Sequence, residues 1–472
     1  MTNDEFRESG HKLIDWIADY RATVAGRPVR ATTTPGSIKA QLPPEPPAEA
    51  EPFSRVLRDL DTILQPGLTH WQHPRFFGYF PSNDTYASVL GDMLAAGLGQ
   101  LGLNWQSSPA LTELEELSCD WLRQMVGLSP AWTGVIQDTA STSTLIALLC
   151  ARERVTNFAL GRGGLQAEPK PLTIYVSTQS HSSVEKAALL AGFGRDNVRA
   201  VPVDDAFAMR ADVLETMIRD DRATGKVPCA VVATTGTTAS TALDPVGAIC
   251  EVAARNHLWV HVDAAMAGSA MILPECRWMW AGIEGADSVV LNPHKWLGAV
   301  FDCSLYYVRD PQHLIRVMST SPSYLLTAAD GQAPNYRDWG IALGRRFRAL
   351  KLWCLVRGEG VSGLQARLRR DMENARWLAD EVARSPNWKV VAPVPLQTVC
   401  VRHEPPGLSG EALDAHTRAW AEKLNASGFA YLTPAVLGGR WMVRVSVASL
   451  TTERADVEAT WRAMREAAGS SH

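Results

Sequence analysis

A lysine, an aspartate and a histidine stand in segments whose composition makes them candidates for chemistry. Lys295 lies in Asn292-Pro293-His294-Lys295-Trp296, where proline and tryptophan would make a poor solvent-exposed face. Asp263 closes an apolar run, and His181 lies among hydroxyl residues in the segment 179–183. An amine can form a Schiff base with a carbonyl, a carboxylate can keep a ring nitrogen protonated, and an imidazole can stack on a ring.

Each of these segments follows a predicted β-strand. We predict strands at Leu172–Ser177, Ala230–Thr235, Leu258–Val262, Ser288–Asn292 and Ser304–Val308, with helices at Ser183–Gly192, Arg210–Asp221 and Pro245–Asn256. Buried strands joined by helices indicate an α/β domain with a largely parallel sheet, which binds ligands at the carboxyl ends of its strands. We therefore expect Lys295, Asp263 and His181 to meet at one edge of this sheet.

This set of side chains fits pyridoxal phosphate. Lys295 would form the Schiff base, Asp263 would pair with the pyridine nitrogen, and His181 would stack on the ring and orient the substrate carboxylate. The hydroxyl-rich segment Asp138–Ser143 precedes an apolar helix and could bind the phosphate at the helix N-terminus. Taken singly, Lys295 could be a solvated lysine, Asp263 a helix cap and His181 a structural histidine. The hydroxyl-rich segment could likewise be a helix cap without a ligand. Their expected convergence at one sheet edge favours the cofactor.

The chain divides by pattern into three segments. We predict an N-terminal helical segment at residues 1–84, which would serve dimerisation if it docks on a partner, a large cofactor-binding domain at 85–360, and a small C-terminal α+β domain at 361–472. Within the first segment, residues 4–24 read as an amphipathic helix, followed by a proline-rich linker at 42–47. The apolar face of this helix could dock on a partner subunit or on its own chain.

Bulk composition limits the possible partners and compartment. The chain has 472 residues, 46% hydrophobic and 20% charged, with a net charge of −4, which gives no reason to expect nucleic acid or an anionic membrane as partner. No signal peptide or membrane-spanning run is apparent. The eight cysteines are scattered without a C-x-x-C pair, so we expect reduced thiols, no metal site and a cytoplasmic protein.

Several longer motifs resemble those of one family. They are His73–Pro81, Trp105–Glu113, His181–Val184, His261–Ala265, Asn292–Trp296 and Leu343–Phe347. In this order they are similar to group II pyridoxal phosphate-dependent decarboxylases of the aromatic-L-amino-acid decarboxylase type, closest to bacterial enzymes that act on L-DOPA and other aromatic amino acids. The resemblance runs from about residue 4 to about residue 465. It implies the fold type I architecture and a homodimer with active sites at the subunit interface.

The resemblance also implies roles for individual residues. Around the cofactor, beside Lys295, Asp263 and His181, it places Ala140, Ser141, Thr238, Ala265, Asn292 and His294, with Asp244 in a supporting position. Around the substrate it places Trp71, Tyr79, Phe80, Ser82, Leu101, Leu103, Leu343 and Gly344. Of these, Leu101, Leu103, Leu343 and Gly344 would reach into the neighbouring subunit's site.

Tyr324 is the candidate proton donor to the substrate's Cα. It lies in a segment, about 320–335, whose composition is typical of a mobile lid, although a surface loop without a role would look similar. Related enzymes without this tyrosine release an aldehyde. The sequence therefore favours decarboxylation of an aromatic L-amino acid to an amine and CO₂, with L-DOPA slightly preferred over tryptophan, 5-hydroxytryptophan, tyrosine and phenylalanine. Aldehyde formation, transamination or a non-catalytic role remain alternatives.

Overall fold

The structure, a computed structural model, describes residues 1–320 and 331–469 and contains two compact units. The first unit comprises Met1–Pro81, Asn374–Val391 and Val399–His472, and the second comprises Ser82–Glu373 and Ala392–Thr398. Both ends of the chain thus belong to one unit. The predicted segments 1–84, 85–360 and 361–472 follow chain order instead and stay a prediction.

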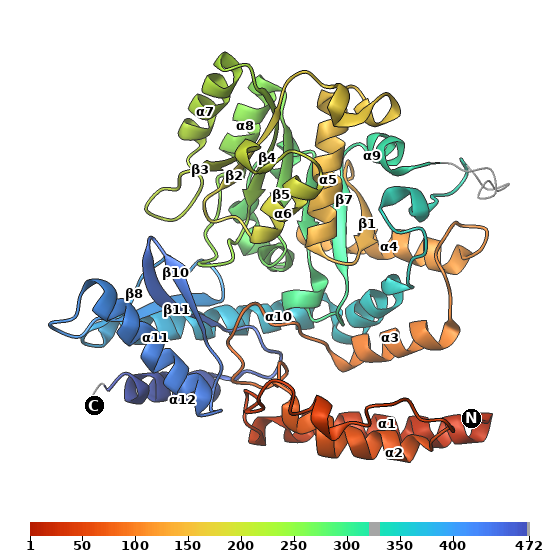
Figure 1. Cartoon of the computed structure of the whole chain (residues 1–472), viewed down its shortest axis with the longest axis vertical. Coiled ribbons are helices and arrows are strands. Elements are labelled where there is room, and N and C mark those ends of the chain that lie inside the picture. Colours follow the sequence, from red (N-terminus) through yellow and green to blue (C-terminus); the bar gives the residue numbers. More distant parts are fainter. Residues whose placement is uncertain (321–330, 470–472) are drawn as a thin grey trace. The chain divides into compact units, whose positions relative to one another are not determined.

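The second unit is built on a seven-stranded sheet (Figure 1). Its strands are β1 Thr133–Gln137, β2 Leu172–Ser177, β3 Val198–Val201, β4 Val227–Thr234, β5 Trp259–Asp263, β6 Ser288–Leu291 and β7 Ser304–Val308. The order is β1-β7-β6-β5-β4-β2-β3, and only β7 runs antiparallel to its neighbours. The predicted α/β fold with a mainly parallel sheet is therefore confirmed. The sequence reading missed β1 and β3, which are the two edge strands and carry no long apolar run.

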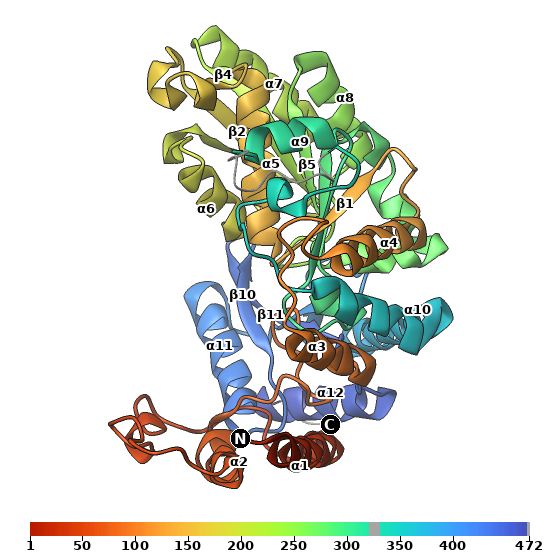
Figure 2. The same ribbon diagram turned by 90° about the vertical axis from the view of Figure 1, so that its right-hand side faces the viewer.

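Helices cover both faces of this sheet (Figure 2). The helices of the unit are α3 Tyr86–Leu98, α4 Pro109–Val126, α5 Ala140–Val155, α6 Ser182–Leu190, α7 Ala211–Ala223, α8 Val246–Asn256, α9 Pro311–Met318 and α10 Arg348–Arg384, which continues into the first unit. Helices α5 and α6 pack together on one face, against a core that includes Val176 and Val232. Helices α7 and α8 contact each other and β4 from the other face. Burial of the strands on both sides accounts for their uninterrupted apolar sequences.

The first unit combines helices with a four-stranded sheet. Its elements are α1 Asn3–Thr23, α2 Phe53–Asp59, β8 Trp388–Val390, β9 Thr398–His403, α11 Gly410–Ala426, β10 Thr433–Leu437, β11 Arg440–Ser446 and α12 Arg454–Ala467. Strand β10 is antiparallel to β11, and β8 is antiparallel to β9. The α+β character predicted for the C-terminal part is confirmed.

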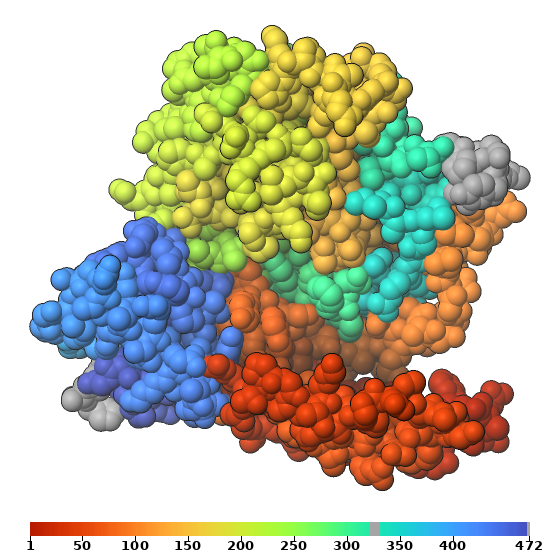
Figure 3. Space-filling model, viewed as in Figure 1, coloured from red at the N-terminus to blue at the C-terminus, as the bar shows by residue number. Residues whose placement is uncertain are grey.

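Helix α1 begins with a capping box, in which the side chains of Thr2 and Glu5 bond each other's backbone N–H groups. No residue of α1 is buried, and the Phe6 side chain is 69% exposed. Polar contacts attach the helix to its own chain: Trp16 Nε1 donates to Asp61 at 2.6 Å, the Tyr20 hydroxyl lies 2.9 Å from His70 Nδ1, and Arg21 donates to Gln72 at 2.8 Å. In the space-filling view the segment containing α1 and α2 forms the red surface (Figure 3).

Within the described ranges, no helix combines the length and the apolar character needed to cross a membrane.

Candidate active site

Lys295 lies in a short turn that follows β6. The turn spans Pro293–Leu297, and the backbone of Lys295 departs from helical geometry within it, with φ −98° and ψ −105°. Its N–H donates to the Asn292 carbonyl at 3.0 Å, and its own carbonyl accepts from Asn83 Nδ2 at 3.3 Å. Lys295 is half-buried among fully buried neighbours. The backbone of the candidate Schiff-base lysine is therefore held in place on both sides.

Asp263 is the last residue of β5, the strand beside β6 in the sheet. It is buried, and its Oδ1 accepts from the backbone N–H of Ala265 at 3.0 Å. Because β5 and β6 are parallel neighbours, with Asp263 opposite Val290, the carboxylate and the turn of Lys295 lie at the same edge of the sheet. The sheet topology therefore brings these two residues to the same edge, as predicted.

His181 begins helix α6 at the same edge. Its Nδ1 accepts from the backbone N–H of Ser183 at 3.2 Å and lies 2.8 Å from the Ser183 hydroxyl. In the neutral ring the proton therefore resides on Nε2. Although the residue as a whole is exposed, desolvation of the ring lowers the pKa of His181; Asp263 opposes this shift and Lys295 adds to it. Asp263 and Lys295 therefore both lie within electrostatic reach of the His181 ring.

Two buried residues flank the lysine. His294 Nδ1 accepts from the backbone N–H of Cys303 at 3.0 Å; burial, and then the neighbouring Lys295 ammonium, lower the pKa of His294 to about 3. The ring is therefore neutral at physiological pH. Asn292 donates its backbone N–H to the Ala265 carbonyl at 3.1 Å.

The N-terminus of α5 offers a place for an anion. Thr139, the N-cap residue, makes no side-chain cap, so the N–H groups of the first turn have no capping acceptor. Ala140 is buried there, whereas Ser141 is exposed. Three buried oxygens on the segments that converge here have no hydrogen-bond partner in the described part of the chain: Asn292 Oδ1, Ser180 Oγ and Thr235 Oγ1. Uncapped N–H groups and unsatisfied oxygens fit a phosphorylated, hydrogen-bonding cofactor.

Comparison with known proteins gives this arrangement its chemical context. Residues 35–404 match the family model described as the pyridoxal-dependent decarboxylase conserved domain. The chain belongs to this family.

Relatives of the decarboxylase cover nearly its whole length. The tyrosine decarboxylase of Papaver somniferum is 39% identical over 487 residues, which is 98% of this chain and 94% of that protein. The phenylacetaldehyde synthase of Arabidopsis thaliana is 37% identical over 478 residues, covering 99% and 96% of the two chains. The crystal structure of Oryza sativa TDC with PLP and tryptamine has a TM-score of 0.96 at 37% identity, covering 99% of this chain and 98% of that one.

These comparisons confirm the predicted group, its fold and its cofactor. The protein is a pyridoxal phosphate-dependent decarboxylase of the aromatic amino acid type.

We call the edge of the seven-stranded sheet that carries Lys295, Asp263 and His181 the cofactor edge. The sequence did not predict several further residues that support this edge of the decarboxylase. His261 on β5 lies 3.3 Å from the Thr144 hydroxyl of α5 and 2.9 Å from the Ser288 hydroxyl of β6. On α10, Arg367 donates to the carbonyl of Trp296 at 2.8 Å, and Asp371 accepts from Trp296 Nε1 at 2.9 Å. Nothing local in the sequence signals these contacts, because the partners are far apart along the chain.

Asp244 and Thr238 lie in and beside the connection that follows β4. The Asp244 carboxylate accepts backbone N–H groups from Met209 at 2.7 Å and from Thr234 at 2.8 Å. Burial raises the pKa of Asp244 to about 6. Its hydrogen bonds suit the supporting position predicted for it. Thr238 is half-buried in the turn between β4 and Asp244.

The predicted substrate residues fall into two groups. In the first unit, the rings of Trp71 and Tyr79 stack with centroids 5.6 Å apart, and the Arg444 guanidinium lies 4.8 Å from the ring of Phe80. Trp71 and Tyr79 belong to one aromatic cluster with Phe76 and Tyr431, in which the Tyr79 hydroxyl lies 3.2 Å from that of Tyr431.

The other group lies in the second unit and includes half-buried Ser82 and Leu103. Leu101 and Leu343 are 53% and 47% exposed. Their loops meet where Gly102 N–H donates to the Arg345 carbonyl at 2.8 Å, and a Cβ at Gly344 would lie 3.1 Å from Leu101 Cδ1.

A buried ion pair holds the backbone where the loops of Leu101 and Leu343 meet. Arg345 donates through both terminal nitrogens to Glu115, at 3.0 and 2.5 Å, and to the Ile136 carbonyl at 2.6 Å. Glu115 is fully buried and also accepts from the Ile136 N–H at 2.9 Å. The two leucine-bearing loops are therefore anchored, although the leucines themselves face solvent in a single chain.

Tyr324 lies outside the described residues, as does the middle of the predicted lid at 321–330.

Proposed function

We propose that the enzyme converts an aromatic L-amino acid to the corresponding arylalkylamine and CO₂, with L-DOPA slightly preferred. The observation that carries this proposal is the grouping of Lys295, Asp263 and His181 at one sheet edge. The preference for a phenolic substrate is supported by relatives such as tyrosine/DOPA decarboxylase 1 of Papaver somniferum, 39% identical over 98% of this chain.

In this proposal each residue of the cofactor edge has one task. Lys295 binds the cofactor covalently, Asp263 keeps its ring nitrogen protonated, and neutral His181 stacks on the ring and orients the substrate carboxylate. When bound, pyridoxal phosphate supplies an electron-withdrawing ring that stabilises the negative charge left at Cα as CO₂ departs. The phosphate is bound by the N-terminus of α5.

The cofactor has further contacts in this proposal. They are with Ala140, Ser141, Thr238, Ala265, Asn292 and His294.

We further propose that the enzyme works as a homodimer with active sites at the subunit interface. Helix α3 and the following loop expose large apolar side chains: Tyr86, Leu90, Met93, Leu94, Leu98 and Leu101. Contiguous apolar surface of this kind is usually covered by a protein partner, and homo-oligomers with two-fold symmetry are the commonest case. The unburied helix α1 supports the same proposal. In this proposal Leu101, Leu103, Leu343 and Gly344 reach into the partner's active site. The further substrate-binding residues are Trp71, Tyr79, Phe80 and Ser82.

We assign Tyr324 as the acid that protonates Cα, which makes the amine the product. A second candidate function is aldehyde formation. It is kept because both an Arabidopsis thaliana phenylacetaldehyde synthase, 37% identical over 99% of this chain, and a Rhodiola rosea 4-hydroxyphenylacetaldehyde synthase structure with a TM-score of 0.92 are among the similar proteins.

The cytoplasm is the proposed compartment. All eight cysteines are free, and seven of them are buried, which suits a reducing environment.

One experiment tests substrate and product together. Purified enzyme with pyridoxal phosphate is incubated in air with L-DOPA, tyrosine, phenylalanine, tryptophan and 5-hydroxytryptophan, and the products are identified by mass spectrometry. We expect amines, with L-DOPA converted fastest. Aldehyde as the main product would overturn the role of Tyr324, and faster turnover of an indole substrate would overturn the substrate preference.

A further inference from the structure

A cavity of about 950 Å³ lies beside the outer edge of β1, and none of the residues assigned to the cofactor or the substrate lines it. Its lining includes Thr133 and Gly134, the first two residues of β1. Strand β1 runs parallel to β6, because both are antiparallel to β7. The proposed phosphate site follows the carboxyl end of β1, so the cavity begins at the opposite end of that strand. Its volume is within the usual range for small-molecule sites.

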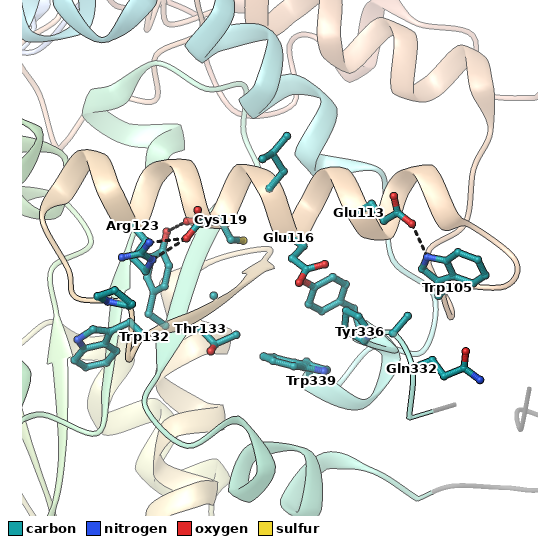
Figure 4. Close-up of a pocket in the computed structure, with 17 residues that line it drawn as sticks. Trp105, Glu113, Glu116, Cys119, Arg123, Trp132, Thr133, Gln332, Tyr336 and Trp339 are labelled. Carbon is teal, nitrogen blue, oxygen red and sulfur yellow. Dashed lines mark hydrogen bonds and ion pairs between the residues drawn. The ribbon is translucent and has the colours of Figure 1, made fainter. Parts of the chain in front are cut away.

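Acidic side chains from one face of α4 line the cavity: Glu113, Glu116 and Asp120 (Figure 4). Two of them already have partners, since Glu113 accepts from Trp105 Nε1 at 2.9 Å and Asp120 pairs with Arg123 at 2.7 Å. Glu116, in contrast, accepts no hydrogen bond and forms no ion pair with any residue that the structure describes. Because Arg123 is the only basic side chain among the described residues of the lining, these residues carry an excess of negative charge.

Aromatic side chains form much of the remaining wall. Tyr336 and Trp339 meet edge to face with ring centroids 5.4 Å apart, and the lining also contains Trp105, Trp132 and Tyr307. Figure 4 shows Tyr336 and Glu116 close together across the cavity, and the Glu116 carboxylate contributes to raising the pKa of Tyr336. Aromatic faces next to uncompensated carboxylates attract organic cations through the ring quadrupole and through charge.

One buried polar group gives independent evidence for a ligand. Trp339 is 5% exposed, and its Nε1 has no hydrogen-bond partner among residues 1–320 and 331–469. Buried polar groups are normally hydrogen-bonded, so a tryptophan N–H left without a partner at the cavity indicates a missing ligand.

We propose that this cavity is a second ligand site, which binds an organic ammonium ion with a flat apolar body. The ammonium group lies against Glu116 and the rings of Tyr336 and Trp339, and the apolar body lies along the tryptophan-lined wall. A bare metal ion fits less well, since no cluster of three or more metal-binding side chains occurs in the described residues. The inference does not depend on the proposed substrate.

The probe is benzyltrimethylammonium, titrated into the holoenzyme by isothermal calorimetry. This cation has no N–H group and cannot form a Schiff base, so binding is not confused with chemistry at Lys295. We expect one saturable site per chain and no saturable binding of neopentylbenzene, its uncharged isostere. Glu116→Gln should weaken binding roughly fivefold, as expected for loss of one ion pair under water-like screening.

Two further variants test whether the cation binds in this cavity. Tyr336→Phe should weaken binding by a smaller factor, whereas Glu251→Gln, an exposed glutamate on α8, should leave it unchanged. The visible absorbance of bound cofactor checks that each variant is folded. Absence of saturable binding would overturn the proposal. Binding that ignores both Glu116→Gln and Tyr336→Phe, or that is displaced by an amino acid substrate, would also overturn it.

Discussion

The cofactor edge and the leucine-bearing loops are built in opposite ways. At the cofactor edge, Asp263, His294 and Asn292 are buried and held by backbone hydrogen bonds from their own chain. At the loops, Leu101 and Leu343 are about half exposed, and only the backbone beneath them is anchored. A single chain thus holds the residues of the cofactor edge in place by itself, whereas the apolar side chains of the loops remain exposed. Under the proposed homodimer, reactivity would be determined within the subunit, and the choice of substrate would depend on residues from both subunits.

At the cofactor edge, replacement of Lys295 should have the largest effect on activity. Lys295→Ala removes the only covalent attachment in the proposal and should lower kcat by more than about 10³-fold, as expected when a covalent-catalysis residue is lost. The visible absorbance of lysine-bound cofactor should also disappear. Lys186→Ala, an exposed lysine on α6, is the matched control.

Mixed dimers extend this test to the loops. Gly344→Trp should block the partner's pocket, so it and Lys295→Ala are each inactive alone. Random exchange of the two variants should restore about a quarter of wild-type activity if each site draws residues from both chains. No recovery would show that the loops serve their own subunit.

Tyr324→Phe should have the next largest effect. Loss of a positioned proton donor typically costs ~10²–10⁴-fold in the step that it catalyses. We expect the variant to keep its cofactor absorbance and to release aldehyde in place of much of the amine, measured by mass spectrometry in air. An unchanged amine yield and rate would remove Tyr324 from the mechanism.

A smaller effect is expected from the ion pair below the loops. Arg345→Lys keeps the charge but loses the forked geometry that joins Glu115 to the Ile136 carbonyl. We expect KM to rise by about 3- to 10-fold with less change in kcat, a cost of about 1 kcal/mol. The control is Arg346→Lys, because that guanidinium makes only exposed contacts of 3.3 Å with Asp92. Equal effects of the two substitutions would contradict a positioning role for Arg345.

The last prediction concerns the pH dependence of stability. Burial lowers the pKa of His261 from 6.5 to about 4 and that of His294 to about 3. Between these values and 6.5 the unfolded chain binds more protons than the folded chain, so stability falls as pH decreases through this window. Each ring should contribute roughly 1.4 kcal/mol per pH unit.

Urea denaturation of the holoenzyme at several pH values measures this slope. His261→Gln should flatten it, whereas His11→Gln, on the exposed surface of α1, should not. A slope that is the same in both variants would show that His261 does not titrate as described.

The parts of the site that could be predicted from the sequence are those in which a strand and its chemical residue are contiguous. Asp263 and Lys295 follow buried apolar runs, so the rule that ligands bind at carboxyl ends of strands was enough to bring them together. The Glu115–Arg345 pair joins positions 230 residues apart, and the sequence around neither residue indicates which residue it pairs with. The edge strand β1 was missed for a related reason, because its short sequence contains a glycine and gives little periodicity.

The cap that His181 provides for α6 has a consequence for the departing carboxylate. Its Nδ1 is committed to Ser183, so the ring can present only an Nε2–H and no formal charge, while the start of the helix adds a partial positive charge. A full cation here would hold the substrate carboxylate most tightly before reaction and would resist its conversion to neutral CO₂. In its proposed role, neutral His181 orients the substrate carboxylate without stabilising the bound substrate strongly. Binding energy is then available to stabilise the transition state instead.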